Sequence, residues 1–106
     1  MRTFFLTSAA IVFSATLTFA QDAQTCAGDG LIAKVIMTHR QAGGWNVNTM
    51  MEKFGAEPGL RAMVLDAYSM PAMQTAATRQ AMINEFANSW SLKCYQDGPA
   101  ISRKPD

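Results

Sequence analysis

The chain has 106 residues, which is enough for one domain, and 16% of them are charged. Nine Lys and Arg residues stand against eight Asp and Glu residues, and like charges form no block along the sequence. Nucleic acids and anionic membrane surfaces are recognised by clustered positive charge. The composition therefore excludes both as expected partners.

Residues 1–20 predict a signal peptide. Arg2 supplies the positive charge, residues 4–19 are uncharged and apolar or small, and Ala20 is the small residue that precedes a cleavage site. The run is short for a bilayer and is diluted by Ser and Thr, so we expect no stable membrane insertion after cleavage. Loss of Arg2 leaves eight basic residues against eight acidic ones. We expect a neutral mature protein that is periplasmic or secreted.

The two cysteines lie near opposite ends of the mature chain. In an exported protein of this size, Cys26 and Cys94 are expected to form one disulfide. The alternative is two free thiols, one of them catalytic, but the sequence has neither a CxxC motif nor a neighbouring Cys–His pair. On the chain-entropy model, closing so long a loop stabilises the fold by about 4 kcal/mol.

A first helix of about three turns is expected after a polar segment, residues 21–25. Its start signal is Asp29-Gly30, and Gly43-Gly44 favours a left-handed cap and a turn at its end. Its apolar side is expected to consist of Leu31, Ile32, Val35 and Ile36.

Two further helices are expected in the middle of the chain. The first is short, is capped by Asn48 or Thr49, and is closed by Gly55. The second carries Pro58 in its first turn, where a missing N–H costs nothing, and stops before Pro71. Its apolar stripe follows helical spacing through Leu60, Met63, Val64, Ala67 and Tyr68.

Residues 75–94 carry the strongest helical pattern, with Thr75 as the expected N-cap. We expect Phe86 and Trp90 at the centre of the core. The stripe consists of Met82, Ile83, Phe86, Ala87, Trp90 and Cys94. No stretch alternates with period two for long enough to predict a strand. The expected fold is all-α: a small orthogonal four-helix domain over residues 21–96, closed by one disulfide and followed by a disordered polar tail, residues 97–106.

Motifs for catalysis are missing from the sequence. It contains no GxSxG, HExxH, CxxCH or phosphate-binding glycine loop, and its acidic residues are scattered. The single histidine, His39, falls near the end of the first expected helix, where a cation interacts well with the helix dipole. We therefore expect neither an enzyme nor a cofactor.

Methionine is unusually frequent, with eight in the chain. Thioethers bind Cu(I), and the MxxM spacing of Met70 and Met73, with His39 as a further ligand, indicates a possible copper site. The competing interpretation is that methionines fill irregular gaps in a small helical core or line an adaptable apolar surface.

Apolar residues also cluster around the short second helix. Trp45, Met50, Met51 and Phe54 lie between the glycines at positions 43–44 and 55. Such a cluster either covers the core as a lid or offers an apolar surface to a protein partner. The sequence leaves both interpretations open.

Several short motifs resemble a group of small secreted helical proteins of proteobacteria and their phages. The resemblance covers about residues 20–96 and adds no activity, cofactor or catalytic residue. It consists of the signal peptide, Cys26 near the mature N-terminus, Arg40-Gln41-Ala42-Gly43, Met50-Met51, Ala67-Tyr68-Ser69-Met70-Pro71 and Cys94-Tyr95.

Taken together, the sequence predicts an exported, non-catalytic binding or interaction protein, chaperone-like or inhibitory, whose protein partner it does not identify. The alternative is a periplasmic Cu(I)-binding protein that uses Met70, Met73 and His39.

Overall fold

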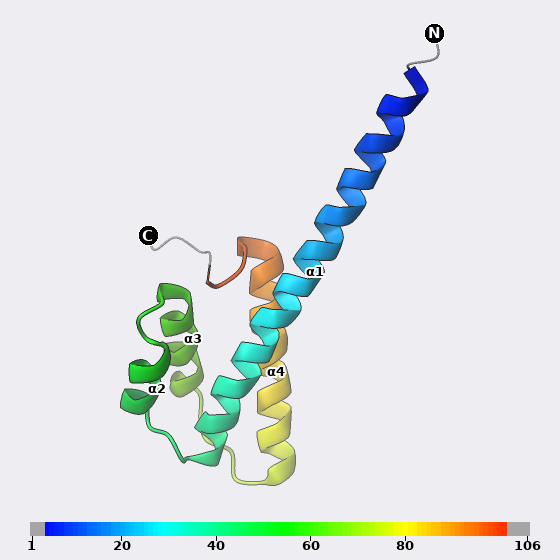
Figure 1. Ribbon diagram of the computed structural model, residues 1–106. Helices are drawn as coiled ribbons and strands as arrows, with labels where there is room; N and C mark the ends of the chain where they lie inside the picture. Colours follow the sequence, from blue (N-terminus) through cyan, green and yellow to red (C-terminus); the bar gives the residue numbers. More distant parts are fainter. Residues whose placement is uncertain (1–3, 102–106) are drawn as a thin grey trace.

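The computed structural model describes residues 4–101, with side chains from residue 22 onward. It contains four helices and, within these residues, no strand: α1 (Phe4–Ala42), α2 (Val47–Phe54), α3 (Pro58–Ser69) and α4 (Ala76–Asp97). Figure 1 shows α4 beside the second half of α1, with α2 and α3 packed on the other side of that half. The all-α fold is confirmed. The orthogonal crossing is not confirmed, since α1 and α4 run alongside each other in opposite directions.

The first helix differs from its expected bounds, because α1 runs without a break through Asp29 and Gly30. A side chain at Gly30 would overlap the Oγ of Ser91, so this glycine lets α4 approach α1 closely. Asp29 is buried and uses its carboxylate on the C-terminal segment rather than on a helix cap. The two residues expected to start a helix therefore lie inside α1, where Gly30 contacts α4 and Asp29 binds the C-terminal segment. The backbone of residues 4–20 continues α1, while residues 1–3 and the side chains of the predicted signal peptide lie outside the described part.

The other three helices begin and end at identifiable caps. Asn46, rather than the expected Asn48 or Thr49, caps α2 by accepting a hydrogen bond from the Thr49 N–H at 2.9 Å. Pro58 occupies the first turn of α3, and Thr75 caps α4 through a reciprocal bond pair with Thr78, as expected for a capping box. The N-cap of α2 therefore lies two or three residues before the positions that we predicted for it.

The core lies between α1, α2, α3 and α4. Phe86 and Trp90 are buried at its centre with ring centroids 6.4 Å apart, and the Trp90 indole donates to Asp66 Oδ2 at 2.9 Å. The stripe predicted for the first helix is only half correct, because Leu31 is 64% exposed and Val35 49% exposed on the outer side of α1. The buried apolar side chains of the core cluster are Ala33, Ile36, Met37, Met50, Met63, Val64, Ala67, Ile83, Phe86, Trp90 and Ala100.

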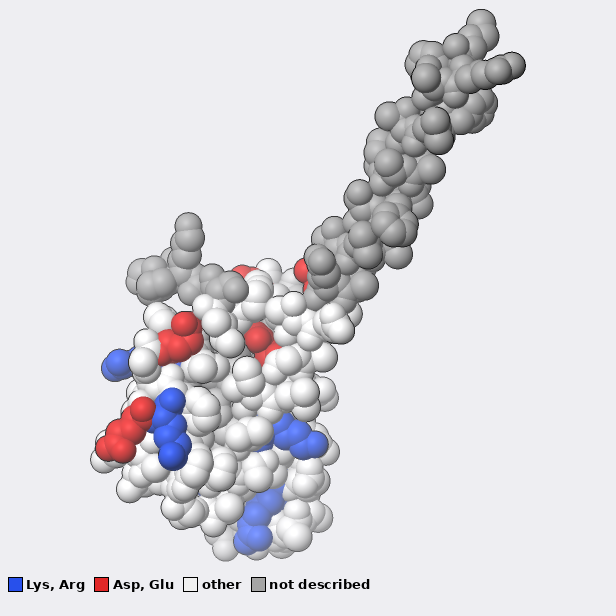
Figure 2. Space-filling model, in the orientation of Figure 1, with Lys and Arg blue, Asp and Glu red and all other residues white. Residues whose placement is uncertain are grey.

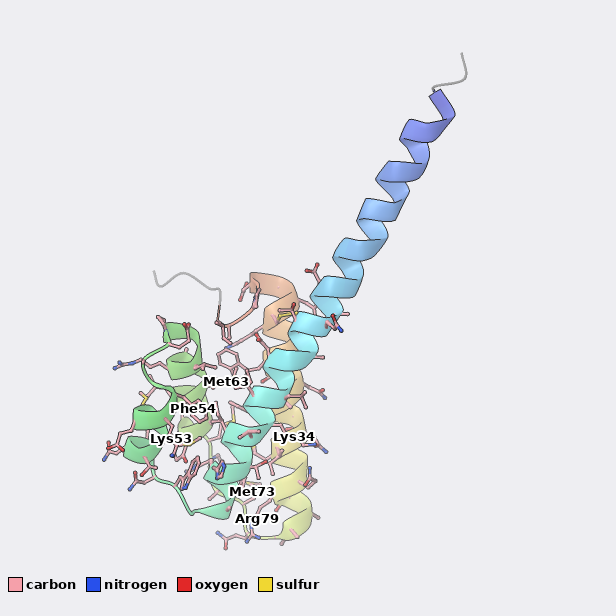
Figure 3. The ribbon with its side chains drawn as sticks, in the orientation of Figure 1. Lys34, Lys53, Phe54, Met63, Met73 and Arg79 are labelled. Atoms are coloured by element: carbon pink, nitrogen blue, oxygen red, sulfur yellow. A yellow bond between two sulfur atoms is a disulfide. The ribbon has the colours of Figure 1, made fainter. Side chains whose placement is uncertain are left out.

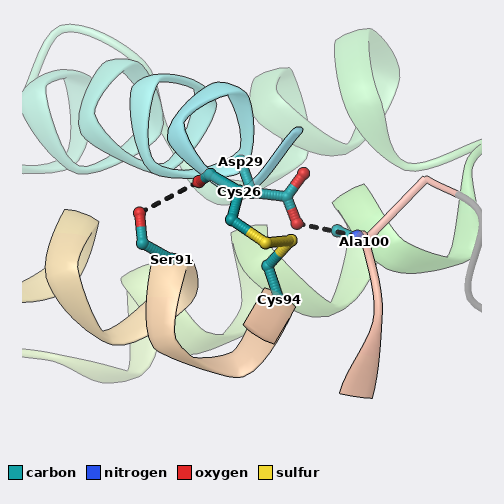
Figure 4. Close-up of a disulfide and its surroundings, with 5 residues drawn as sticks. All are labelled: Cys26, Asp29, Ser91, Cys94 and Ala100. Carbon is teal, nitrogen blue, oxygen red and sulfur yellow. Dashed lines mark hydrogen bonds between the residues drawn. A yellow bond between two sulfur atoms is a disulfide. The ribbon is translucent and has the colours of Figure 1, made fainter. Parts of the chain in front are cut away.

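The predicted disulfide is present and joins α1 to α4. The Cα atoms of Cys26 and Cys94 lie 5.3 Å apart, and both cysteines are buried. Beside the bond, Ser91 Oγ donates to the Cys26 carbonyl at 3.1 Å, as Figure 4 shows. The bridge therefore fixes the start of the packed part of α1 to the end of α4.

The chain after α4 folds back onto the helices. Gly98 ends α4 with a positive φ of 91°, and Ala100 is fully buried. The Ala100 N–H donates to Asp29 Oδ2 at 2.8 Å, which Figure 4 also shows, and the Ala100 carbonyl packs against Gly59 of α3. We call residues 98–101 the C-terminal strap. The prediction of a disordered tail from residue 97 is wrong for residues 97–101. Asp97 is the last residue of α4, and Ala100 is held by the Asp29 carboxylate and packs against Gly59. Residues 102–106 lie outside the described part.

Candidate functional site

The turn between α1 and α2 presents the most distinctive surface. Gly43 ends α1 with a positive φ of 75° and donates its N–H to the His39 carbonyl at 3.1 Å. The chain then reverses, and Asn46 starts α2 one residue after Trp45. Trp45 is thus fixed between two capped helix ends rather than on a long loop.

Three elements hold Trp45 in place. The His39 ring of α1 stacks on the indole with centroids 3.8 Å apart and planes 6° apart. The Lys53 ammonium of α2 lies 4.8 Å from the centre of the same ring system. From α3, the Tyr68 hydroxyl donates to the Trp45 carbonyl at 2.6 Å. The indole is half-buried and packs against the core.

An open cavity of about 550 Å³ lies beside this tryptophan, between the end of α1, the turn and α3. Apolar groups form most of its wall. Leu65, which projects from α3, remains 50% exposed there. We call this space the Trp45 cavity; it is lined by Arg40, Gly43, Trp45, Asn46, Val47, Leu65, Tyr68 and Ser69. One cation and no acidic residue stand among these eight.

Arg40 and Tyr68 form the polar side of the Trp45 cavity. The guanidinium donates through Nε and Nη2 to the Met70 carbonyl, at 3.1 and 2.9 Å, and its carbon lies 5.3 Å from the centre of the Tyr68 ring. Burial raises the pKa of the Tyr68 hydroxyl above its ordinary value, while the neighbouring Arg40 charge lowers it to a smaller extent. Tyr68 is therefore a neutral hydrogen-bond donor at physiological pH, committed to Trp45.

The residue after Arg40 fixes the loop between α3 and α4. Gln41 is buried, donates to the Pro71 carbonyl at 2.9 Å, and accepts from the Met73 N–H at 2.7 Å. Together with the bonds from Arg40 to Met70, these contacts attach residues 70–73 to the end of α1. The loop below the Trp45 cavity is thus held by two consecutive side chains of one helix.

The predicted copper ligands already have other contacts. The Met70 side chain packs against the core, and the His39 ring is stacked on Trp45. Met73 is half-buried, and its carbonyl accepts from Arg79 Nε at 3.0 Å; Figure 3 labels both residues at the lower end of the molecule. Among the described residues, no group of three or more His, Cys, Asp or Glu side chains is placed to bind a metal ion. The Cu(I) site stays a prediction.

The predicted partner-binding cluster is divided by the structure. Met50 is fully buried in the core, so its assignment to a partner surface is wrong. The reason is that Met50 lies on the face of α2 that packs against the core cluster. Met51 and Phe54 are half-buried and pack against the core, with Phe54 and Lys53 labelled on α2 in Figure 3. Of the four predicted residues, only Trp45 lines the cavity.

Seven lining residues were not predicted as part of a site: Arg40, Gly43, Asn46, Val47, Leu65, Tyr68 and Ser69. Leu65 had a detectable signal, since it is a large apolar residue that lies off the predicted stripe of its helix. The others depend on how α1, the turn and α3 meet, which local sequence does not encode.

Comparisons of the chain with protein-family models, curated proteins and solved structures find no match. Within the described residues, no helix offers a stretch both long enough and apolar enough to traverse a bilayer.

Proposed function

We propose that this chain is an exported, non-catalytic binding protein that takes an apolar group of a partner protein into the Trp45 cavity. The observation that carries the proposal is the cavity itself, an apolar space of about 550 Å³ beside an aromatic ring held by three helices. Rigid aromatic and aliphatic surfaces of this kind anchor partners, because little conformational freedom is lost on binding.

The disulfide and the pattern of residues 1–20 support export. Disulfides persist in the periplasm and outside cells and are rare in the cytosol. The buried bond between Cys26 and Cys94 closes the helical domain from end to end, and residues 1–20 have the pattern of a signal peptide. We place the mature protein in the periplasm or in the secreted fraction.

Binding accounts for the cavity better than catalysis does. The hydroxyl of Tyr68 in its wall donates a hydrogen bond to the Trp45 carbonyl. Burial raises the pKa of this hydroxyl, so it stays protonated. Arg40 is tied to the Met70 carbonyl. Among the described lining residues, none is a carboxylate, histidine or cysteine that would act as a base or nucleophile.

Site-specific photocrosslinking tests the proposal. A photo-crosslinking amino acid is placed at Leu65, inside the cavity, and in a second strain at Leu92, which is 56% exposed on α4 and does not line it. Both positions are exposed leucines of helices, so both variants are expected to fold. We expect adducts with exported proteins from position 65 only. Equal adducts from both positions, or none from position 65, would contradict the proposal.

The identity of the adduct also separates the two roles predicted from sequence. A chaperone-like protein is expected to give many adducts, and more after acid or heat stress. An inhibitory module is expected to give one adduct with a folded partner, in a fixed ratio.

A further inference from the structure

One cation lines the Trp45 cavity and a second lies against the Trp45 ring, while no acidic residue is among the lining residues. Arg40 lines it, and the Lys53 ammonium lies 4.8 Å from the Trp45 ring centre. Figure 2 shows most acidic side chains of this face over the upper half, toward the disulfide, and most basic ones over the lower half, where α2, the end of α1 and the start of α4 lie; one acidic side chain at the left of the lower half lies beside a basic one. Glu52, next to Lys53 on α2, is exposed and does not line the cavity.

Both cations have capacity left for a ligand. Arg40 donates to Met70 through two of its nitrogens, and its third, Nη1, makes no hydrogen bond to any described residue. Lys53 is exposed, and its ammonium forms no ion pair with an acidic side chain in the described part of the chain. An anion that approaches either cation would therefore displace no existing ion pair among the described residues.

We propose that the Trp45 cavity binds a polypeptide segment in which a large apolar side chain stands next to Asp or Glu. This inference rests on the proposed function and names the chemistry of its partner. The apolar side chain fills the space between Trp45, Leu65 and Val47, and the carboxylate lies near Lys53 and Arg40. Asn46, whose side-chain oxygen is used by the α2 cap, still has its NH₂ group for a peptide carbonyl.

The shape of the cavity favours a polypeptide over a fatty acid. Small-molecule sites enclose most of their ligand, whereas this cavity is open and leaves Leu65 half exposed at its edge. A long acyl chain bound there would keep much of its surface in water. A peptide anchor brings its own flanking residues, which cover the exposed edge once the side chain is seated.

The test is a titration followed by ¹⁵N NMR, in which the indole signals of Trp45 and Trp90 report separately. Trp45 is at the cavity and Trp90 is buried in the core, so the second signal is an internal control. The probes are three blocked hexapeptides with the same central Leu-Phe pair, flanked on both sides by Asp, Ser or Lys. Dodecanoate is a fourth probe.

We expect the Asp peptide to shift the Trp45 signal and to bind about fivefold more tightly than the Lys peptide at low salt, because exposed ion pairs each contribute a small factor. The difference should shrink in 0.5 M NaCl. Lys53→Gln should reduce it to about twofold, whereas the matched change Lys34→Gln, on exposed α1 surface away from the cavity, should leave it intact.

The remaining outcomes separate this inference from the proposed function. Equal binding of all three peptides, lost in Leu65→Ser but kept in Leu92→Ser, would overturn the acidic preference and leave the apolar cavity as the binding site. Tighter binding of dodecanoate than of any peptide would assign the cavity to acyl carboxylates and overturn the polypeptide. No shift of Trp45 with any probe, together with no adduct from position 65, would overturn both proposals.

Discussion

The contact between Gly59 and the C-terminal strap gives a sharp test of the fold. A methyl group added at Gly59 would overlap the carbonyl of Ala100, which is backbone and has no side-chain freedom to move aside. In Gly59→Ala the strap must therefore shift. The shift would break the hydrogen bond from the Ala100 N–H to Asp29 and leave a buried carboxylate without its partner.

The cost follows from the groups involved. Losing a buried hydrogen bond to a charged group costs about 1.5–3 kcal/mol. Exposing the Ala100 methyl adds about 1 kcal/mol, while Ala in place of Gly in a helix returns at most about 1 kcal/mol. We expect Gly59→Ala to lower the free energy of unfolding by about 2 kcal/mol. With a urea m-value of about 1 kcal/mol/M for a domain of this size, the midpoint should fall by about 2 M.

Gly28 supplies the matched control. It also lies inside a helix, but a side chain there would meet no atom within 4 Å. Gly28→Ala should therefore raise the free energy of unfolding by up to about 1 kcal/mol through helix propensity alone. In a chain that stops after Asp97 the strap is gone, and Gly59→Ala should then be neutral or stabilising. An unchanged midpoint for Gly59→Ala in the full chain would refute the reasoning, because the strap would then not be packed on α3.

Three further predictions follow from the same structure. Cys94→Ser should lower the free energy of unfolding by about 4 kcal/mol, as should reduction of the bond to Cys26; mass spectrometry that finds two free thiols in the native protein would contradict it. Phe86→Ala should cost about 3–5 kcal/mol in urea unfolding, and a near wild-type midpoint would mean that this stripe is not the core. Since burial raises the pKa of Tyr68, its share of stability is present below pH 10 and is lost as the pH rises through its folded-state pKa. Tyr68→Phe should flatten the alkaline loss of stability, whereas Tyr95→Phe, at an exposed position, should not.

Local signals in the sequence predicted much of the fold. Thr75 and Pro58 sit where capping and first-turn preferences place them, and the α4 stripe through Phe86 and Trp90 is buried because helical spacing alone brings these residues onto one face. The disulfide followed from the number of cysteines together with the export that we predicted from residues 1–20. The caps and the stripe could be predicted because each depends on a few neighbouring residues. The disulfide could be predicted because the chain contains only two cysteines.

The errors arise where distant residues decide a local outcome. Asp29 reads as a helix start, but its carboxylate accepts from Ala100, 71 residues away. Gly30 was the other half of that expected start signal, but it lies inside α1 and lets Ser91 of α4 approach closely, beside the disulfide that joins the two helices. The Trp45 cavity is of the same kind, since α1, the turn and α3 each contribute part of its wall. Such features depend on tertiary contacts that override local propensity.

The strap and the Trp45 cavity contact opposite ends of the packed part of α1, which makes stability and binding separable. Asp29 and Arg40 are eleven residues apart on this helix, or roughly 16 Å along its axis. Gly59→Ala should therefore lower stability yet leave the affinity for the Asp-flanked peptide unchanged at 10 °C, where the variant is still folded. Tyr68→Phe should weaken binding while costing less stability, about 1 kcal/mol, because it removes the hydrogen bond to the Trp45 carbonyl and loosens the indole at the cavity. If Gly59→Ala weakens binding as much as Tyr68→Phe does, the cavity is not a preformed site. Its shape would then depend on the packing of the C-terminal strap at the other end of α1.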